Sequence, residues 1–150
     1  MRHDTDPLEQ QPDNEETLPS DVLIRVLNAS PAYRHIGMKV VLAEEGASRI
    51  EMEVREELKN LYGTVHGGLL ATLMDSACGV ALGSLLQAGE TLVTLDLRIN
   101  YLSPVKSGTV IAEGKVVHKG RQTGVAEATL KDESGRLTAK GMSTHFVRKS

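Results

Sequence analysis

The residues best suited to chemistry lie close together in the middle of the chain. Asn60 to Gly68 reads NLYGTVHGG, and one carboxylate, Asp75, follows inside a long apolar segment. Gly67 and Gly68 stand where a helix is expected to begin, so their free N–H groups and the helix dipole would stabilise an oxyanion. Because glycine has no Cβ, a ligand can also approach the backbone closely there.

Asp75 is the second candidate group, because an unpaired carboxylate is costly to bury in an apolar helix. An isolated aspartate is more often a solvated helix-edge residue or a satisfied buried one. The neighbouring glycine pair favours the functional interpretation.

The spacing between the two features predicts an assembly. Asp75 lies nine positions after His66, and a helix rises about 1.5 Å per residue, so roughly 13 Å separates the helix start from the carboxylate. Within one chain the two groups cannot act on one substrate atom, nor can His66 and Asp75 share a metal ion. If both act on the same carbonyl, the carboxylate belongs to a second subunit whose helix runs oppositely, which predicts a dimer with interfacial active sites.

Hydrophobic periodicity predicts the elements that position these groups. Alternating apolar residues predict a hairpin over 38–54, the run GGLLATLMDSACGVALGSLLQA predicts a helix that ends near Gly89, and further strands follow over 94–101, 109–119, 123–131 and 137–148. A short helix is expected from Ser20. In the strand 94–101, Leu95, Leu97, Ile99 and Tyr101 are expected on one face and Thr94 on the other. Short connections favour a four-strand meander after the helix, and hence an α+β fold in which a curved sheet wraps a buried helix.

Length and composition limit the class of protein. The 150 residues, 40% hydrophobic and 25% charged, fit one domain over 18–150 after a polar tail over 1–17 that is expected to be disordered. The net charge of −3 argues against a nucleic-acid partner. Asp75 and the recurring glycines argue against a membrane span in the apolar run, and the N-terminus lacks the pattern of a signal peptide, so we expect a cytoplasmic protein.

The quoted residues resemble a known family over about 37–147. Asn60, the turn His66-Gly67-Gly68, Asp75 at its spacing, and the strand VTLDLRINYLSP over 93–104 are similar to the PaaI-like (phenylacetic acid degradation type) branch of the hotdog-fold acyl-CoA thioesterases. The resemblance implies a hotdog fold, hydrolysis of acyl-CoA thioesters to free acid and CoA, and a homotetramer built from dimers.

The resemblance also implies roles for individual residues. The Gly67 N–H would polarise the thioester carbonyl, and Asp75 of the facing subunit would activate water or attack directly. Asn60 and His66 would shape the turn and orient the thioester, while Thr94 would position the water. General base and nucleophile both stay open for Asp75, because a thiolate leaves with little acid assistance.

Coenzyme A is implied to lie across residues 101–106 and 118–122. The implied substrate-binding residues are Gly68, Tyr101, Ser103, Pro104, Lys106, Lys119, Gly120 and Arg121. Lys106, Lys119 and Arg121 would contact its phosphates, although each alone is nearly as well explained as a solvated turn charge. We expect no metal, and no cofactor beyond the coenzyme A of the substrate.

Two other functions remain open at this point. The same fold could serve as a non-catalytic acyl-CoA binding or sensing module, or as a hydratase or dehydratase, whose usual His and carboxylate motif is absent here. His3, His35, His118 and His145 lack metal-ligand spacing, so surface or packing roles are expected for them. Cys78 has apolar neighbours and no activating base.

Overall fold

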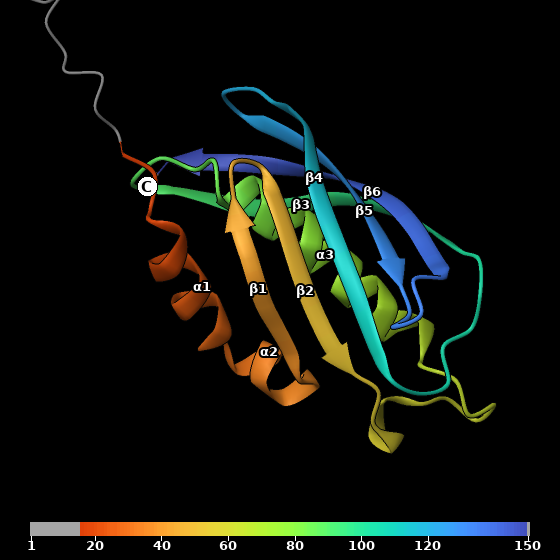
Figure 1. Ribbon diagram of the computed structural model, residues 1–150. Coiled ribbons are helices and arrows are strands. Elements are labelled where there is room, and N and C mark those ends of the chain that lie inside the picture. Colours follow the sequence, from red (N-terminus) through yellow and green to blue (C-terminus); the bar gives the residue numbers. More distant parts are fainter. Residues whose placement is uncertain (1–15, 150) are drawn as a thin grey trace, which may run out of the picture.

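The computed structural model describes residues 16–149, in which one long helix is enclosed by a curved antiparallel sheet (Figure 1). The helices are α1 (Ser20–Asn28), α2 (Pro31–Ile36) and α3 (Gly67–Gly83), with a short 3-10 helix at Glu56–Leu58. The strands are β1 (Met38–Glu44), β2 (Ala47–Glu53), β3 (Glu90–Tyr101), β4 (Thr109–Lys119), β5 (Thr123–Lys131) and β6 (Leu137–Lys149). Helices α1 and α2 lie beside β1, at one margin of the sheet (Figure 1). The predicted α+β class is confirmed.

The order of the strands is β1-β2-β4-β5-β6-β3, and every neighbouring pair is antiparallel. The predicted hairpin of β1 and β2 is confirmed, with Glu45 and Gly46 both at positive φ in its turn, as a two-residue hairpin turn requires. The predicted four-strand meander is wrong: β4, β5 and β6 follow one another, but β3 pairs with β6. Because α3 crosses the concave face, β3 joins the sheet at the far edge, and the loop 102–108 leads back to β4, which pairs with β2.

Helix α3 is shorter than predicted, since it ends at Gly83 rather than near Gly89. The hydroxyl of Ser84 donates to the Ala81 carbonyl at 2.7 Å and accepts the Gly46 N–H at 2.9 Å, which fixes the helix end against the β1–β2 turn. Gly89, with a φ of 81°, then turns the chain into β3. The end of the helix is therefore determined by a tertiary contact that apolar periodicity cannot reveal.

The core lies between α3 and the concave face of the sheet. Buried apolar residues of α3 are Leu70, Leu73, Met74, Ala77, Cys78, Val80, Ala81 and Leu82. The helix and sheet approach closely at Gly114 of β4, where a Cβ would overlap the carbonyl oxygen of Ala77. That carbonyl also accepts the hydroxyl of Ser48 from β2 at 2.6 Å. A glycine of the sheet thus permits this approach.

A β-bulge in β3 changes which side chains face the helix. The register against β6 shifts between Thr94 and Asp96, so Thr94 turns towards α3 together with Leu97 and Ile99, while Leu95 is 61% exposed. The prediction that Leu95 shares a face with Leu97 and Ile99, and that Thr94 lies on the other face, is therefore wrong. One extra residue in the strand reverses the alternation on either side of it.

The expected tail over 1–17 lies outside the described residues except for Glu16 and Thr17. Thr17 forms an isolated antiparallel bridge with Gln87. Within 16–149, no helix combines the length and apolar character needed to cross a membrane.

Candidate active site

Asp75 lies on α3 at the border of a largely apolar cavity of about 650 Å³. The cavity is formed by α1, α2, α3 and the start of β3, and its apolar lining includes Leu18, Leu23, Leu27, Tyr33, Val80, Leu86 and Leu92. The side chain of Asp75 is 38% exposed. Burial raises the pKa of the Tyr33 phenol in the same cavity. A carboxylate thus borders a chamber that suits an apolar group.

Three side chains from two strands connect to Asp75. The hydroxyl of Thr94 donates to Asp75 Oδ1 at 3.0 Å. His145 Nε2, from β6, lies 3.1 Å from Thr94 Oγ1 and 3.8 Å from Asp75 Oδ1. On the other side of the ring, Nδ1 lies 3.2 Å from Ser143 Oγ. No hydrogen bond within 16–149 is made to Asp75 Oδ2.

His145 is a residue beside Asp75 that sequence reasoning did not place there. Its side chain is only 3% exposed, and this burial lowers the pKa of its imidazole although the Asp75 carboxylate acts in the opposite direction. Strand alternation alone would place Ser143, His145 and Val147 on the helix-facing side of β6. Pairing of β6 with β3 brings His145 to Thr94, and the meander expected from the sequence does not contain that pairing.

The beginning of α3 presents a free backbone donor. His66 is the N-cap, and its Nδ1 accepts the Gly68 N–H at 2.9 Å, so the neutral imidazole carries its proton on Nε2. The Gly67 N–H has no acceptor among residues 16–149. The Gly67 carbonyl accepts the Tyr101 hydroxyl at 2.7 Å. Of the two candidate amides, Gly67 is therefore the one available to an oxyanion.

Asn60 makes local side-chain hydrogen bonds in the loop before the helix. Its side-chain oxygen accepts the Tyr62 N–H at 2.9 Å, and its amide nitrogen donates to the Thr64 hydroxyl at 3.0 Å. The loop closes a hollow of about 330 Å³ beside the helix start. The hollow brings together the predicted site residues Asn60, Gly67, Tyr101, Ser103 and Pro104.

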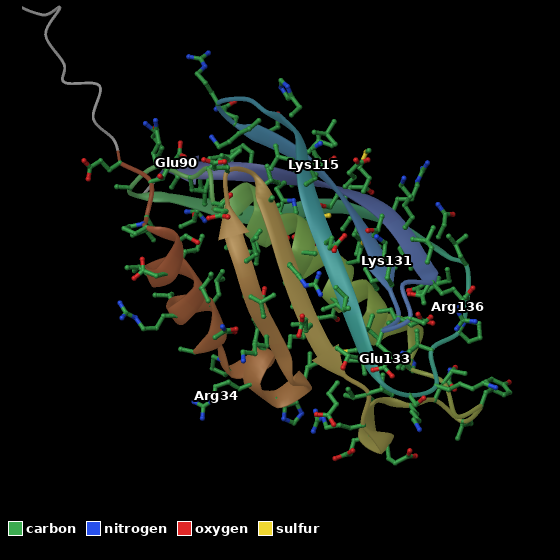
Figure 2. All side chains as sticks on the ribbon, viewed as in Figure 1. Arg34, Glu90, Lys115, Lys131, Glu133 and Arg136 are labelled. Carbon is green, nitrogen blue, oxygen red and sulfur yellow. The ribbon has the colours of Figure 1, made fainter. Side chains whose placement is uncertain are left out.

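The three predicted phosphate-binding cations are not brought together within one chain. Lys119, Gly120 and Arg121 border a cavity of about 970 Å³ at one end of β4, where Lys119 lies 3.8 Å from Glu90. Lys106 lies after β3, in a hollow that also contains Glu133. Figure 2 shows Glu90 and Glu133 at opposite ends of the molecule. Arg121 and Lys106 form no ion pair among the described residues.

Cys78 does not supply a nucleophile. Its buried thiol donates to the Ala126 carbonyl at 3.6 Å, and burial raises its pKa to about 11. The thiolate is the reactive form of cysteine, so the burial of Cys78 agrees with the apolar neighbours and the missing activating base noted in the sequence.

Comparison with known proteins identifies similar chains. The family described as "Thioesterase superfamily" matches residues 62–139, more than half of the chain. Acyl-coenzyme A thioesterase 13 of Mus musculus is 32% identical over 83% of this chain and 91% of its own length. The structure of thioesterase HI1161 of Haemophilus influenzae has a TM-score of 0.81 and 27% identity, covering 90% of this chain and 94% of that one. The E. coli PaaI protein, from the phenylacetic acid degradation operon, shares the fold with a TM-score of 0.76 at 23% identity, covering 84% and 90%. The hotdog fold predicted from the sequence is confirmed.

Proposed function

Because this chain belongs to the thioesterase superfamily and is a thioester hydrolase, we propose that it hydrolyses acyl-CoA thioesters at a site built by two protomers. The mouse relative is named as an acyl-coenzyme A thioesterase. The observation that carries the proposal is the placement of Asp75 at an apolar cavity, with Oδ1 held by Thr94 and Oδ2 without a partner within 16–149.

The chemistry follows from that placement. The acyl chain occupies the apolar cavity, and its carbonyl carbon lies beside Asp75 Oδ2. Acting as general base, Asp75 takes a proton from a water whose oxygen attacks the carbonyl carbon; acting as nucleophile, it forms an anhydride that water then opens. In both cases the C–S bond breaks, coenzyme A leaves as the thiolate, and a backbone N–H stabilises the oxyanion.

The oxyanion donor comes from the second protomer. Gly67 and Asp75 lie on one helix, and their eight-residue separation corresponds to about 12 Å, too far for one carbonyl. A two-fold axis that sets Gly67 of each protomer beside Asp75 of the other passes near Ala71 and makes the two α3 helices antiparallel. Each dimer then holds two sites.

The edge strand β3 supports the same axis. Tyr101 contacts Gly67 and Thr94 contacts Asp75, so the midpoint between these contacts falls near Leu97 and Arg98. In the sheet order, β3 is an edge strand, and an unpaired edge can accept a strand from another chain. Val93 and Leu95 are 47% and 61% exposed on it. Antiparallel pairing of two β3 strands about this midpoint places these side chains beside the partner strand and closes the dimer.

Of the three cations expected to contact coenzyme A, the phosphates are assigned to the two that have no acidic partner among the described residues. These are Lys106 and Arg121, at opposite ends of the 11-residue strand β4, which corresponds to roughly 35 Å. One protomer therefore offers only one of them to a given phosphate group. Lys119 is paired with Glu90, so it is less available to a phosphate group than the other two.

A thiol-release screen over short, medium, long and aromatic acyl-CoAs tests the proposal. We expect release by the unaltered protein and its loss in Asp75→Asn, which keeps the shape of the side chain but removes its charge. Asp21→Asn is the matched control, because Asp21 is exposed on α1 and its substitution should leave the rate unchanged.

Other outcomes of the screen would contradict the proposal. Tight binding of acyl-CoA without thiol release would favour a binding or sensing module. Loss of the conjugated absorbance of an enoyl-CoA without thiol release would favour a hydratase. A full rate in Asp75→Asn would remove the carboxylate from the mechanism.

A further inference from the structure

The side chains around Asp75 form one continuous chain of hydrogen bonds whose direction can be deduced. An ionised carboxylate only accepts, so Thr94 must use its single hydroxyl proton to donate to Asp75 Oδ1. Thr94 Oγ1 therefore has no proton left for the imidazole. The contact of 3.1 Å between Thr94 Oγ1 and His145 Nε2 then requires that Nε2 carries the proton and donates it.

The same logic determines the state of the other ring nitrogen. A neutral imidazole with its proton on Nε2 accepts at Nδ1, so the Ser143 hydroxyl donates to Nδ1 across 3.2 Å. The chain runs in one direction, from Ser143 to His145, from His145 to Thr94 and from Thr94 to Asp75. Burial lowers the pKa of His145, which favours the neutral ring that this order requires.

The surroundings keep the imidazole in place. Its side chain is 3% exposed, and Gly79 of α3 leaves room for it, because a Cβ there would lie 3.4 Å from Nε2. In the pairing of β6 with β5, the residue opposite His145 is Gly124. The titratable groups nearby are Asp75 and Cys78 of α3 and Tyr33 of α2, and none of these is a cation.

We infer that His145 is a positioning residue for the hydrolysis: it fixes the rotation of the Thr94 hydroxyl so that this group donates to Asp75 Oδ1 and leaves Oδ2 for the reaction. The inference rests on the proposed function. Without the Nε2–H, the Thr94 hydroxyl could turn away to another acceptor. Asp75 would then lose both its orienting contact and the preference for one oxygen over the other.

Kinetics of four variants test the inference. His145→Gln keeps an N–H donor near the Nε2 position, whereas His145→Leu removes it, and Thr94→Val removes the intermediate hydroxyl at nearly constant volume. We expect His145→Leu to lower kcat about tenfold, as for loss of a hydrogen bond to a charged group, with KM changed by less than about twofold. His145→Gln should stay within about threefold of the wild-type kcat.

The double variant and the pH profile separate positioning from a general structural effect. Because His145 acts through Thr94, the variant with both His145→Leu and Thr94→Val should be no slower than Thr94→Val alone. Protonation of His145 would reverse the role of Nδ1 and place a cation beside Asp75. The wild-type kcat should therefore decrease as the pH is lowered below about 6.5, the ordinary pKa of histidine. His145→Gln should lack this part of the pH dependence.

An NMR measurement that needs no turnover keeps this inference distinct from the proposed function. Imidazole ¹⁵N shifts at neutral pH should show His145 with its proton on Nε2, with the signals assigned by their loss in His145→Gln. An Nδ1–H ring, a wild-type kcat in His145→Leu, or multiplying effects in the double variant would each overturn the inference. Absence of thiol release with the expected tautomer would instead refute the proposed function and leave the hydrogen-bond order intact.

Discussion

The shared active site can be tested by removing the oxyanion donor and the carboxylate on different chains. Gly67 is the first residue of α3, a position where proline is well tolerated. His66, with φ −58° and ψ 130°, already has the conformation that a following proline favours. Gly67→Pro therefore deletes the N–H with little change to the helix. Gly67→Ala is the matched control, since it keeps the N–H and adds a Cβ about 3.4 Å from the Tyr101 ring.

The expected magnitudes follow from the arrangement of the sites. Loss of one oxyanion donor lowers kcat by about 10²–10³, so Gly67→Pro and Asp75→Asn should each be nearly inactive alone. In a mixed dimer, one site carries both lesions and the other combines an intact Gly67 with an intact Asp75. Random assortment makes about half of all dimers mixed, so the mixture should recover about a quarter of the wild-type kcat per protomer.

The assay is thiol release by the two variants, co-expressed with different affinity tags or refolded together in equal amounts. Purification through both tags in sequence isolates mixed dimers, in which about half of the wild-type kcat is expected. If each site used Gly67 and Asp75 of the same chain, every site in the mixture would carry one lesion and no activity would return. That result would refute the two-protomer site.

Two further predictions concern the stability of the fold. Gly114→Ala should lower the free energy of unfolding by about 1–3 kcal/mol, because the new Cβ overlaps the Ala77 carbonyl. Gly83→Ala is the control and should not lower it, because a Cβ there has nothing within 4 Å. Urea titration of both variants measures the difference. Since the folded-state pKa of His145 is lowered from 6.5, its contribution to stability is present above pH 6.5 and is lost as the pH falls through the folded-state pKa. As the pH is lowered from 8 to 5, the melting temperature should therefore fall less steeply for His145→Gln than for wild type. Parallel curves of melting temperature against pH would contradict this.

The sequence predicted local structure better than the pairing of distant segments. Alternation placed β1, β2, β4, β5 and β6 correctly, because inward and outward residues differ in polarity along each strand. It did not reveal that β3 pairs with β6. The pairing partner of a strand depends on the path of α3 across the sheet, and the residues of 90–101 do not indicate which strand lies beside them. The sequence did not place His145 near Asp75 for the same reason, because His145 comes close to Asp75 only through the pairing of β6 with β3.

The groups at the helix start were easier to predict than those around the carboxylate. A glycine pair at the beginning of an apolar helix identifies a free donor from local rules alone, and the structure leaves the Gly67 N–H without an acceptor among the described residues. Local rules alone did not distinguish the two amides, because the distinction depends on the rotamer of His66, whose Nδ1 accepts the Gly68 N–H. The choice of Gly67 came from the family resemblance. Separation of Lys106 from Arg121 follows from the length of β4, whose bounds agree with the strand predicted over 109–119.

The bulge at Leu95 makes β3 two half-strands with opposite phase. Before it, even-numbered residues such as Thr94 look towards the helix, and beyond it odd-numbered residues such as Leu97 do so. The half before the bulge thus contacts the carboxylate through Thr94, and the half after it packs against the core through Leu97 and Ile99. Deletion of Leu95 would leave Thr94 and Leu97 two positions apart, so a regular strand would carry both side chains on its helix-facing side. With Leu95 present, only the bulge allows both to face the helix.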